Sequence, residues 1–348
     1  MRLLVLSASD VHALLGYREC ADAMRDALTG LSAGRAQQPR RSIIKPEGAA
    51  GFMALMPSYL AGDVAAASAA GQGEAGLPGE AVYGLKAICI TPANPAAGLD
   101  THQGVVLLSD GRTGEPLALL NASAVTEIRT AAVSVIATDT LAIPGADRLA
   151  VIGTGVQARA HIKALDATRQ LTEIRVAGRE HTRTMQFAAS FGGQTKAPVR
   201  ALPSASEAVA GADLIVTATS SAQPVLQYDW IAPGAHINAV GACLPHQREL
   251  DTATVAAGVL FADRRDSLLA ESGDYLLAAA EGAVSEQHLR AELGEVLTGA
   301  VPGRGSAAEV TIFESLGLAI EDLAAAACAY RNAIRAGSDS PQGFWVSF

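Results

Sequence analysis

The 348-residue chain lacks the sequence features of membrane-spanning and secreted proteins. No stretch approaches the roughly 20 consecutive apolar residues that a transmembrane helix requires. The opening segment, MRLLVLSASDVHALLG, has an apolar run that is too short for a signal-peptide core followed by a cleavage site. We therefore expect a cytoplasmic protein with no membrane partner.

The chain also lacks an excess of basic residues and closely spaced pairs of cysteines. The formal net charge is −9, whereas binding to nucleic acid or an anionic membrane needs a concentrated basic field. The four cysteines, Cys20, Cys89, Cys243 and Cys328, form no CxxC pair, so the sequence signals neither a zinc site nor a disulfide framework. We expect no bound metal, four reduced thiols and a small-molecule partner.

The length predicts about two domains, at roughly 150 residues per domain. In the N-terminal part, residues 9–33 are expected to form one amphipathic helix that Ser9 or Asp10 caps and Gly34 ends. Residues 61–80 are rich in Ala and Gly and can bury little apolar surface, which predicts a surface loop.

Short apolar stretches bounded by Gly or Pro predict strands in the same part of the chain. These strands are expected over residues 52–60, 82–90 and 104–110, with a turn at 110–114 and a long helix over 122–141.

From Asp147 onward, apolar segments of strand length alternate with helical ones, which predicts a parallel, doubly wound sheet. The expected strands are DRLAVIG, EIRVAG, PVRAL, DLIVTAT, HINAVG and GVLFAD. After about Glu309, the apolar segment Ile312–Ile334 is expected to be a helix that returns to the first domain.

A glycine-rich motif follows the first of these strands. Gly153, Gly155 and Ala158 form GxGxxA at the junction of a strand and a helix, and Val156 and Gln157 complete the loop. The first glycine permits the turn, the second lets the backbone approach a pyrophosphate, and the alanine allows close helix packing. This predicts a Rossmann dinucleotide site; the alternative is an α/β domain whose glycines only turn the chain.

The end of the second strand bears on the choice of cofactor. Arg179 lies where a 2′-phosphate would bind, and the strand tip itself has no acidic residue to hold a ribose hydroxyl. This favours NADP. Glu180 is the next residue and keeps NAD as an alternative cofactor. A further alternative is that Arg179 is a solvated surface residue with no role in binding. Ligands bind at the carboxyl ends of such strands, which adds further cofactor residues: Thr217, Ala218, Thr219, Val240 and Gly241.

Ten segments in order give the chain a resemblance to the ornithine cyclodeaminase/mu-crystallin family. They are RRS (40–42), MPSY (56–59), GLK (84–86), HQGVVLLSD (102–110), EIRTAAVSVIAT (127–138), VIGTGVQA (151–158), HINAVGA (236–242), RELD (248–251), ESGD (271–274) and FESLGLAIED (313–322).

The resemblance implies an α/β fold in which a Rossmann domain, residues 129–317, is inserted in an α+β domain made of 1–128 and 318–348. That second domain would bind substrate and form a homodimer. The resemblance also implies that Arg41 and Arg129 bind a substrate carboxylate and that Lys86 is the catalytic acid or base. Ser315 is expected near the nicotinamide.

The chemistry of these residue types agrees with the implied roles. A guanidinium grips a carboxylate with two parallel hydrogen bonds, although Arg129 taken alone could pair with Glu127 or another surface acid. Lys86 lies in an apolar run, where burial lowers the pKa of an ammonium; alternatively its head reaches water. His102 could border the substrate or be a structural histidine.

One position departs from the cyclodeaminases. These enzymes have an aspartate six residues before the Glu of the RELD-like segment, and this chain has Cys243 there. The departure favours reduction of a cyclic ketimine carboxylate, Δ1-pyrroline-2-carboxylate or Δ1-piperideine-2-carboxylate, to L-proline or L-pipecolate. The alternatives are ornithine cyclodeamination with recycled NAD, an amino-acid dehydrogenase and a crystallin-like binding protein.

Overall fold

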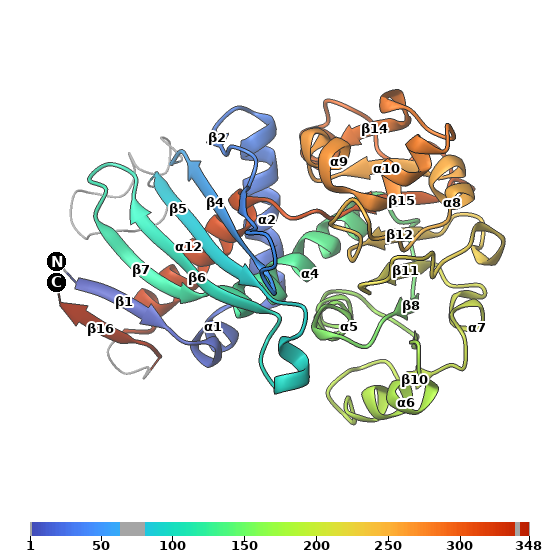
Figure 1. Cartoon of the computed structure of the whole chain (residues 1–348), viewed down its shortest axis with the longest axis horizontal. Helices are drawn as coiled ribbons and strands as arrows, with labels where there is room; N and C mark the ends of the chain where they lie inside the picture. Colours follow the sequence, from blue (N-terminus) through green and yellow to red (C-terminus); the bar gives the residue numbers. More distant parts are fainter. Residues whose placement is uncertain (1, 63–80, 338–341, 348) are drawn as a thin grey trace. The chain divides into compact units, whose positions relative to one another are not determined.

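The computed structural model describes residues 2–62, 81–337 and 342–347. Backbone contacts divide the chain into two compact units, Met1–Arg129 with Leu318–Phe348, and Thr130–Gly317 (Figure 1). Of the predicted surface loop, residues 63–80 lie outside the described part. Among the described residues, no helix is both long and apolar enough to cross a bilayer.

The first unit contains a mixed sheet with strand order β16-β1-β7-β6-β5-β4-β2, and β3 also pairs with β4. Its strands are β1 (Arg2–Leu6), β2 (Ala36–Gln37), β3 (Ser42–Ile44), β4 (Phe52–Leu60), β5 (Val82–Ile90), β6 (His102–Asp110), β7 (Pro116–Asn121) and β16 (Phe344–Ser347). The three predicted strands are present, and the third starts two residues earlier than expected, at His102. Asp110 forms the predicted turn, where its carboxylate accepts the N–H groups of Arg112 and Thr113 at 2.9 and 2.6 Å.

Helix α12 (Ala319–Ala336) packs on one face of β4, β5 and β6. The approach is close because a glycine lies beneath the helix: a Cβ added to Gly84 would lie 2.7 Å from Leu323 Cδ1. This packing fixes the first turn of α12 over the middle of β5 and buries the side chains between them.

The prediction of one helix over residues 9–33 is wrong. The structure has two helices, α1 (Ala8–Leu14) and α2 (Tyr17–Ser32), and Ser7 rather than Ser9 or Asp10 caps the first. Leu15 leaves the helical conformation with ψ 87°, and Gly16 has an extended backbone at the start of α2. Glycine costs about 1 kcal/mol inside a helix, so the chain breaks at this point.

Helix α4 (Ala122–Leu141) has the predicted bounds. It starts directly after β7, and the boundary between the two units falls within it, after Arg129. Its residues are buried along most of its length. Such a helix gives Arg129 a rigid support at the edge of the first unit.

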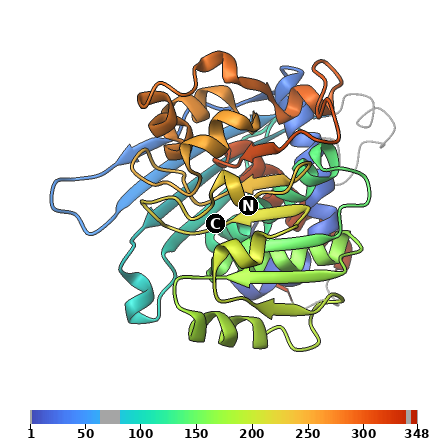
Figure 2. The same ribbon diagram turned by 90° about the vertical axis from the view of Figure 1, so that its right-hand side faces the viewer.

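The second unit is built on a parallel sheet with strand order β10-β9-β8-β11-β12-β15-β13-β14. The strands are β8 (Arg148–Ile152), β9 (Glu173–Ala177), β10 (Val199–Ala201), β11 (Leu214–Thr217), β12 (His236–Ala239), β13 (Val259–Ala262), β14 (Leu289–Glu292) and β15 (Thr311–Glu314). In Figure 2 the green and yellow strands of this sheet run side by side. The chain leaves β8 toward opposite edges, so β8 and β11 mark the switch point of a doubly wound fold. The predicted fold class is confirmed.

Helices connect these strands, as the alternation predicts. They are α5 (Val156–Thr168), α6 (His181–Ala189), α7 (Ala205–Val209), α8 (Thr252–Ala257), α9 (Arg265–Glu271), α10 (Gly273–Ala280) and α11 (Leu293–Leu297).

The prediction of a continuous helix over Ile312–Ile334 is wrong at its start. Residues 311–314 form strand β15, which pairs with both β12 and β13, and the helix begins only at Ala319. Three of the four strand residues are β-branched or aromatic, all four are buried, and Gly317 adopts φ +81° between strand and helix. Burial on both faces of a central strand makes a run of apolar residues look the same as a buried helix.

Candidate active site

Lys86 is a buried cation in the middle of β5. Strand pairing places it level with Met56 on β4 and Val106 on β6, both of which are buried on the α12 side of the sheet. Only 4% of Lys86 is exposed. A lysine in this position needs a compensating charge, because an isolated buried ammonium is costly.

Asp322 in the first turn of α12 supplies that charge. Its Oδ2 lies 2.6 Å from Lys86 Nζ, and its Oδ1 accepts a hydrogen bond from Nε of Arg129 at 3.0 Å. Arg129 also donates from Nη1 to Glu321 Oε2 at 2.8 Å. Residues from β5, α4 and α12 thus form one buried ionic cluster of two cations and two carboxyl groups, in which each side chain is at most 6% exposed.

The buried setting tunes the proton affinities of this cluster. Burial lowers the pKa of Lys86 to about 8, although the charge of Asp322 opposes the shift; Arg129 adds to the lowering. Burial raises the pKa of Glu321, and Arg129 opposes that shift. An ammonium whose pKa is near neutrality can give or take a proton at working pH, as acid–base catalysis requires.

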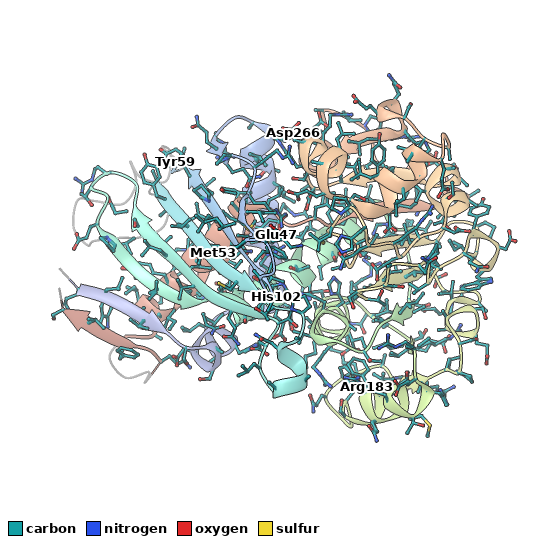
Figure 3. The ribbon with its side chains drawn as sticks, in the orientation of Figure 1. Glu47, Met53, Tyr59, His102, Arg183 and Asp266 are labelled. Carbon is teal, nitrogen blue, oxygen red and sulfur yellow. The ribbon has the colours of Figure 1, made fainter. Side chains whose placement is uncertain are left out.

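Arg41 and His102 belong to the same neighbourhood. The charge of Arg41 contributes to lowering the pKa of Lys86. His102, at the start of β6 (Figure 3), has a lowered pKa, first because protein atoms surround its ring and then because Lys86 and Arg129 carry positive charge. Part of its side chain is exposed. The first unit therefore gathers four of the residues that the sequence singled out: Arg41, Lys86, His102 and Arg129.

The sequence did not assign roles to Glu321 and Asp322, although both lie in the FESLGLAIED segment that carries the resemblance. The acids that pair with Arg129 come from α12, and not from the nearby Glu127, whose carboxylate lies 3.4 Å from His12 Nε2. The sequence signal that could have revealed them is a pair of acidic residues at the start of a mainly apolar helix. The helix dipole stabilises negative charge at that end.

In the second unit, the glycine motif has the geometry of a dinucleotide loop. Gly153 follows β8 with φ +132°, and a Cβ at this position would lie 2.4 Å from the carbonyl oxygen of Ala218 after β11. Any other residue would push apart the loops at the switch point. Gly155 is the N-cap of α5, and Ala158 is fully buried in the first turn of this helix.

Two observations in the second unit fit a phosphate-bearing nicotinamide cofactor. A Cβ added to Gly155 would meet nothing within 4 Å, so the helix start faces open space that even a small side chain would begin to fill. Val156, which opens the helix, is 56% exposed, and Gln157 is next to it. In addition, the hydroxyl of buried Ser315 has no hydrogen-bond partner among the described residues. Unpaired backbone N–H groups at a helix N-terminus bind phosphate, and a nicotinamide amide would satisfy such a hydroxyl.

A buried carboxyl group, Glu249, joins two of the strand ends. Its oxygens accept the N–H of Thr219 after β11 at 2.5 Å and that of Gly241 after β12 at 2.7 Å. Gly241 has no room for a side chain, because a Cβ would lie 2.0 Å from the carbonyl oxygen of Thr219. Val240 donates its N–H to the carbonyl of Thr217, which extends the pairing past the strands. The predicted residues at these two strand ends are therefore held together by a residue to which the sequence reading gave no role.

Further buried acids surround Glu249. Asp274 accepts the N–H groups of Glu249 and Leu250 at 2.7 and 2.9 Å, and Glu314 accepts the hydroxyl of Ser272 at 3.0 Å. Burial raises the pKa of Glu249, raises that of Asp274 to about 7 and raises that of Glu314 well above its usual value. Among the described residues, no group of three or more His, Cys, Asp or Glu side chains is placed to hold a metal ion.

Arg179 lies at the tip of β9, where a 2′-phosphate was predicted. It is exposed, and Gly178 before it packs against Thr154 of the glycine loop, because a Cβ at Gly178 would lie 3.0 Å from Thr154 Cγ2. Glu180 is also exposed and occupies the N-cap position of α6, and Arg183 stands on the same helix (Figure 3). Arg179 and Glu180 thus follow the end of the second strand, and Arg183 lies in the first turn of α6.

Cys243 is partly buried, and its thiol donates to the carbonyl oxygen of Val240 at 3.1 Å, with a longer contact to that of Ser315 at 3.6 Å. Both acceptors belong to loops at the carboxyl ends of strands. A thiol thus occupies the position where the resemblance to the cyclodeaminases led us to look for an aspartate.

The sequence profile of the ornithine cyclodeaminase/mu-crystallin family matches residues 1–337. This chain belongs to that family. The ketimine reductase mu-crystallin of Mus musculus is 37% identical over 85% of each chain. Among solved structures, the Delta(1)-pyrroline-2-carboxylate reductase of Thermococcus litoralis, in complex with NADH and L-proline, has a TM-score of 0.88 and 34% identity over 98% of this chain and 99% of that one. An archaeal alanine dehydrogenase dimer with bound NAD also has a TM-score of 0.88, with 29% identity over the whole of both chains.

Proposed function

We propose that this protein is an NAD(P)H-dependent reductase of a cyclic ketimine carboxylate. Its substrates are Δ1-pyrroline-2-carboxylate or Δ1-piperideine-2-carboxylate, and its products are L-proline or L-pipecolate. The observation that carries the proposal is the buried Lys86, with a pKa of about 8, beside Arg129. The similarity to a ketimine reductase and to a reductase bound to NADH and L-proline supports this choice of substrate.

Reduction of a C=N bond needs a hydride at carbon and a proton at nitrogen. A bound dihydronicotinamide supplies the hydride. Arg41 and Arg129 orient the substrate carboxylate, which fixes the position of the adjacent carbon. Lys86 donates a proton to the ring nitrogen, so its N–H bond breaks as the N–H bond of the product amine forms. Water restores the proton on Lys86 after the product leaves.

The second unit holds the cofactor. The loop from Gly153 to Ala158 receives the pyrophosphate, the loops after β11 and β12 line the nicotinamide half, and Ser315 donates to or accepts from the carboxamide. We propose that NADP is preferred, because Arg179 is exposed at the end of β9 and a 2′-phosphate offers it charge-assisted hydrogen bonds. Glu180 keeps NAD as the alternative cofactor.

We further propose that the protein is a homodimer. The face of β4, β5 and β6 opposite α12 presents apolar side chains that include Tyr83, Val105 and Met53, which are 50, 38 and 37% exposed. Tyr59 lies on the same face of β4 (Figure 3). An apolar sheet face of this kind is typical of an interface between subunits, and the archaeal relative is a dimer. Sedimentation should give twice the mass of one chain, and Tyr83→Glu should yield monomers.

The second candidate is an amino-acid dehydrogenase, which the similarity to alanine dehydrogenase favours. Such an enzyme would need ammonia and a 2-oxo acid in place of a preformed ring. Ornithine cyclodeamination is less well supported because of Cys243.

All three activities would operate in the cytoplasm, where we propose that the protein works, since NAD(P)H is available and thiols stay reduced there.

One experiment separates these functions. The absorbance of NADPH and NADH is followed with each cyclic imine, with 2-oxo acids plus ammonia, and with ornithine. We expect oxidation with at least one imine, at a rate far above that with pyruvate and ammonia. Oxidation only with 2-oxo acids and ammonia would establish the dehydrogenase, and ammonia release from ornithine without net cofactor change would establish the cyclodeaminase.

A further inference from the structure

Asp322 occupies a special place in the ionic cluster. Its two oxygens bind different cations, with Oδ2 at 2.6 Å from Lys86 Nζ and Oδ1 at 3.0 Å from Arg129 Nε. Glu321 differs, because one of its oxygens binds Arg129 Nη1 and also the N–H of Leu318, and it has no ion pair with Lys86. Asp322 therefore connects the lysine to the arginine.

The charges around Lys86 make this connection important. Arg129 comes from α4, Arg41 from the segment before β3 and His102 from β6, and each is either positive or able to become so. Among the described residues, Asp322 and Glu321 at the start of α12 are acids that face this group, and Asp100 acts on His102. Without Asp322, Lys86 would stand near two guanidinium groups and would lose the ion pair that it makes within the described part of the chain.

We propose that Asp322 is the positioning residue of this site, which joins Lys86 to Arg129 and favours the ammonium form of Lys86. The inference rests on the proposed function, in which Lys86 donates a proton and Arg129 binds the carboxylate. One carboxylate that binds both groups fixes the distance between the proton donor and the carboxylate anchor. The ring nitrogen and the carboxylate of a ketimine acid are likewise held at a fixed separation.

The position of Asp322 on the fold supports this role. It lies in the first turn of α12, where the helix dipole stabilises a negative charge. The packing of Leu323 over Gly84 fixes that turn above β5, two residues from Lys86. The carboxylate is 1% exposed, so water does not replace it as the partner of Lys86.

The test reads the proton affinity of Lys86 directly. The chain contains only four lysines, Lys45, Lys86, Lys163 and Lys196. After labelling with lysine that carries ¹³C at Cε, replacing each of the other three by arginine assigns the remaining signal to Lys86. Its chemical shift is then followed against pH in the wild type, in Asp322→Asn and in the matched control Glu321→Gln.

We expect Lys86 to titrate near pH 8 in the wild type. In Asp322→Asn its pKa should fall by about one unit or more, as expected when an opposite charge in contact is removed. In Glu321→Gln the fall should be clearly smaller, because Glu321 does not touch Lys86. No fall in the asparagine variant, or an equal fall in both variants, would overturn the proposal.

Two further measurements complete the test. The alkaline limb of kcat/KM for the imine should move to lower pH in Asp322→Asn by the same amount as the Lys86 signal. If that variant does not fold, Asp322→Glu decides, because it keeps the charge and should leave Lys86 titrating near its wild-type pH; a fall of about one unit there would contradict the proposal. If the wild type reduces no cyclic imine while the Lys86 signal responds as expected, the proposed function fails and the positioning role stands.

Discussion

In the first unit, the buried carboxylates of Glu321 and Asp322 face cations, whereas in the second unit Glu249 and Asp274 face backbone N–H groups. The first arrangement has two cations that favour ionised carboxylates beside the proposed substrate site. The second arrangement joins loops at the carboxyl ends of strands, and burial there favours the protonated acids although the N–H groups oppose that shift. The comparison suggests that charge in the first unit serves chemistry, and that buried acids in the second unit serve the shape of the cofactor site.

The largest effect that would sharpen this comparison is expected at Lys86. Lys86→Met removes the proton donor while keeping the volume, so kcat/KM should fall roughly 10²- to 10⁴-fold, the usual contribution of acid–base catalysis. Folding and NADPH binding, measured by thermal melting and fluorescence titration, should be kept. Lys45→Met, at an exposed position, is the control. A fully active Lys86→Met enzyme would mean that the proton comes from another group.

Arg129→Lys should lower kcat/KM by about tenfold or more, although the charge is kept. A lysine cannot reproduce the two directed hydrogen bonds to Glu321 and Asp322, and a hydrogen bond to a charged group contributes about 1.5–3 kcal/mol. The control is Arg335→Lys, which affects an exposed pair with Glu19 at 4.0 Å that should contribute little. Equal kinetics for the two variants would leave Arg129 with a structural role only.

In the second unit, Arg179→Asp should reverse the cofactor preference by about 1–2 kcal/mol, roughly one charged hydrogen bond. The aspartate would repel the 2′-phosphate of NADPH and leave NADH less affected or better bound. Steady-state kinetics with both cofactors would measure this, with Arg200→Asp, at another exposed position of the same unit, as the control. If the wild type strongly prefers NADH and Arg179→Asp changes neither apparent affinity, Arg179 does not contact the cofactor.

Glu249→Gln should weaken cofactor binding by about tenfold, because one of the two N–H groups of Thr219 and Gly241 would meet an amide donor instead of an oxygen. With saturating cofactor, the KM for the imine should stay close to that of the wild type. Isothermal titration with the oxidised cofactor gives the affinity, and Glu281→Gln, at an exposed pair with Arg248, is the control. A raised imine KM together with unchanged cofactor affinity would contradict the division between the two units.

The smallest effect concerns pH and stability. The pKa of Asp274 is raised from 3.8 to about 7 in the folded protein, so the folded state keeps a proton that the unfolded chain releases. Its favourable contribution is complete below about pH 4 and is lost as the pH rises to about 7. Asp274→Asn cannot ionise, so its Tm should fall less than that of the wild type between pH 4 and 8, by about 2–4 °C. Parallel Tm curves for the two proteins would show that Asp274 is ionised throughout.

Much of the fold followed from local patterns. The bounds of β4, β5 and α4 agree with those predicted from the sequence, because each is an apolar stretch of suitable length that ends near Gly or Pro. The glycine loop was also readable, since its motif describes a backbone conformation, which Gly153 adopts at φ +132°. The break between α1 and α2 was missed because apolar spacing continues across Leu15 and Gly16.

The candidate site was harder to predict than the fold. Arg129 and Asp322 are separated by 193 positions, so no local pattern connects them. The role of Glu249 could not be predicted for a different reason. Its partners are backbone N–H groups, which every residue except proline has, so no pattern of residue types marks them. The resemblance to the family drew attention to the cations, whereas the carboxyl groups that hold them emerged only from the packing of α12.

The proposed reaction is tested most directly by following the hydride itself. Cofactor that carries deuterium at C4 of the dihydronicotinamide is incubated with Δ1-pyrroline-2-carboxylate or Δ1-piperideine-2-carboxylate, and the amino acid formed is examined by mass spectrometry. Two cofactor samples are compared, each with deuterium on one of the two faces of C4. We expect proline or pipecolate with one deuterium at C2 from one sample and no deuterium from the other. Absence of deuterium from the product, or a labelled open-chain amino acid formed only when ammonia and a 2-oxo acid are supplied, would contradict the proposal.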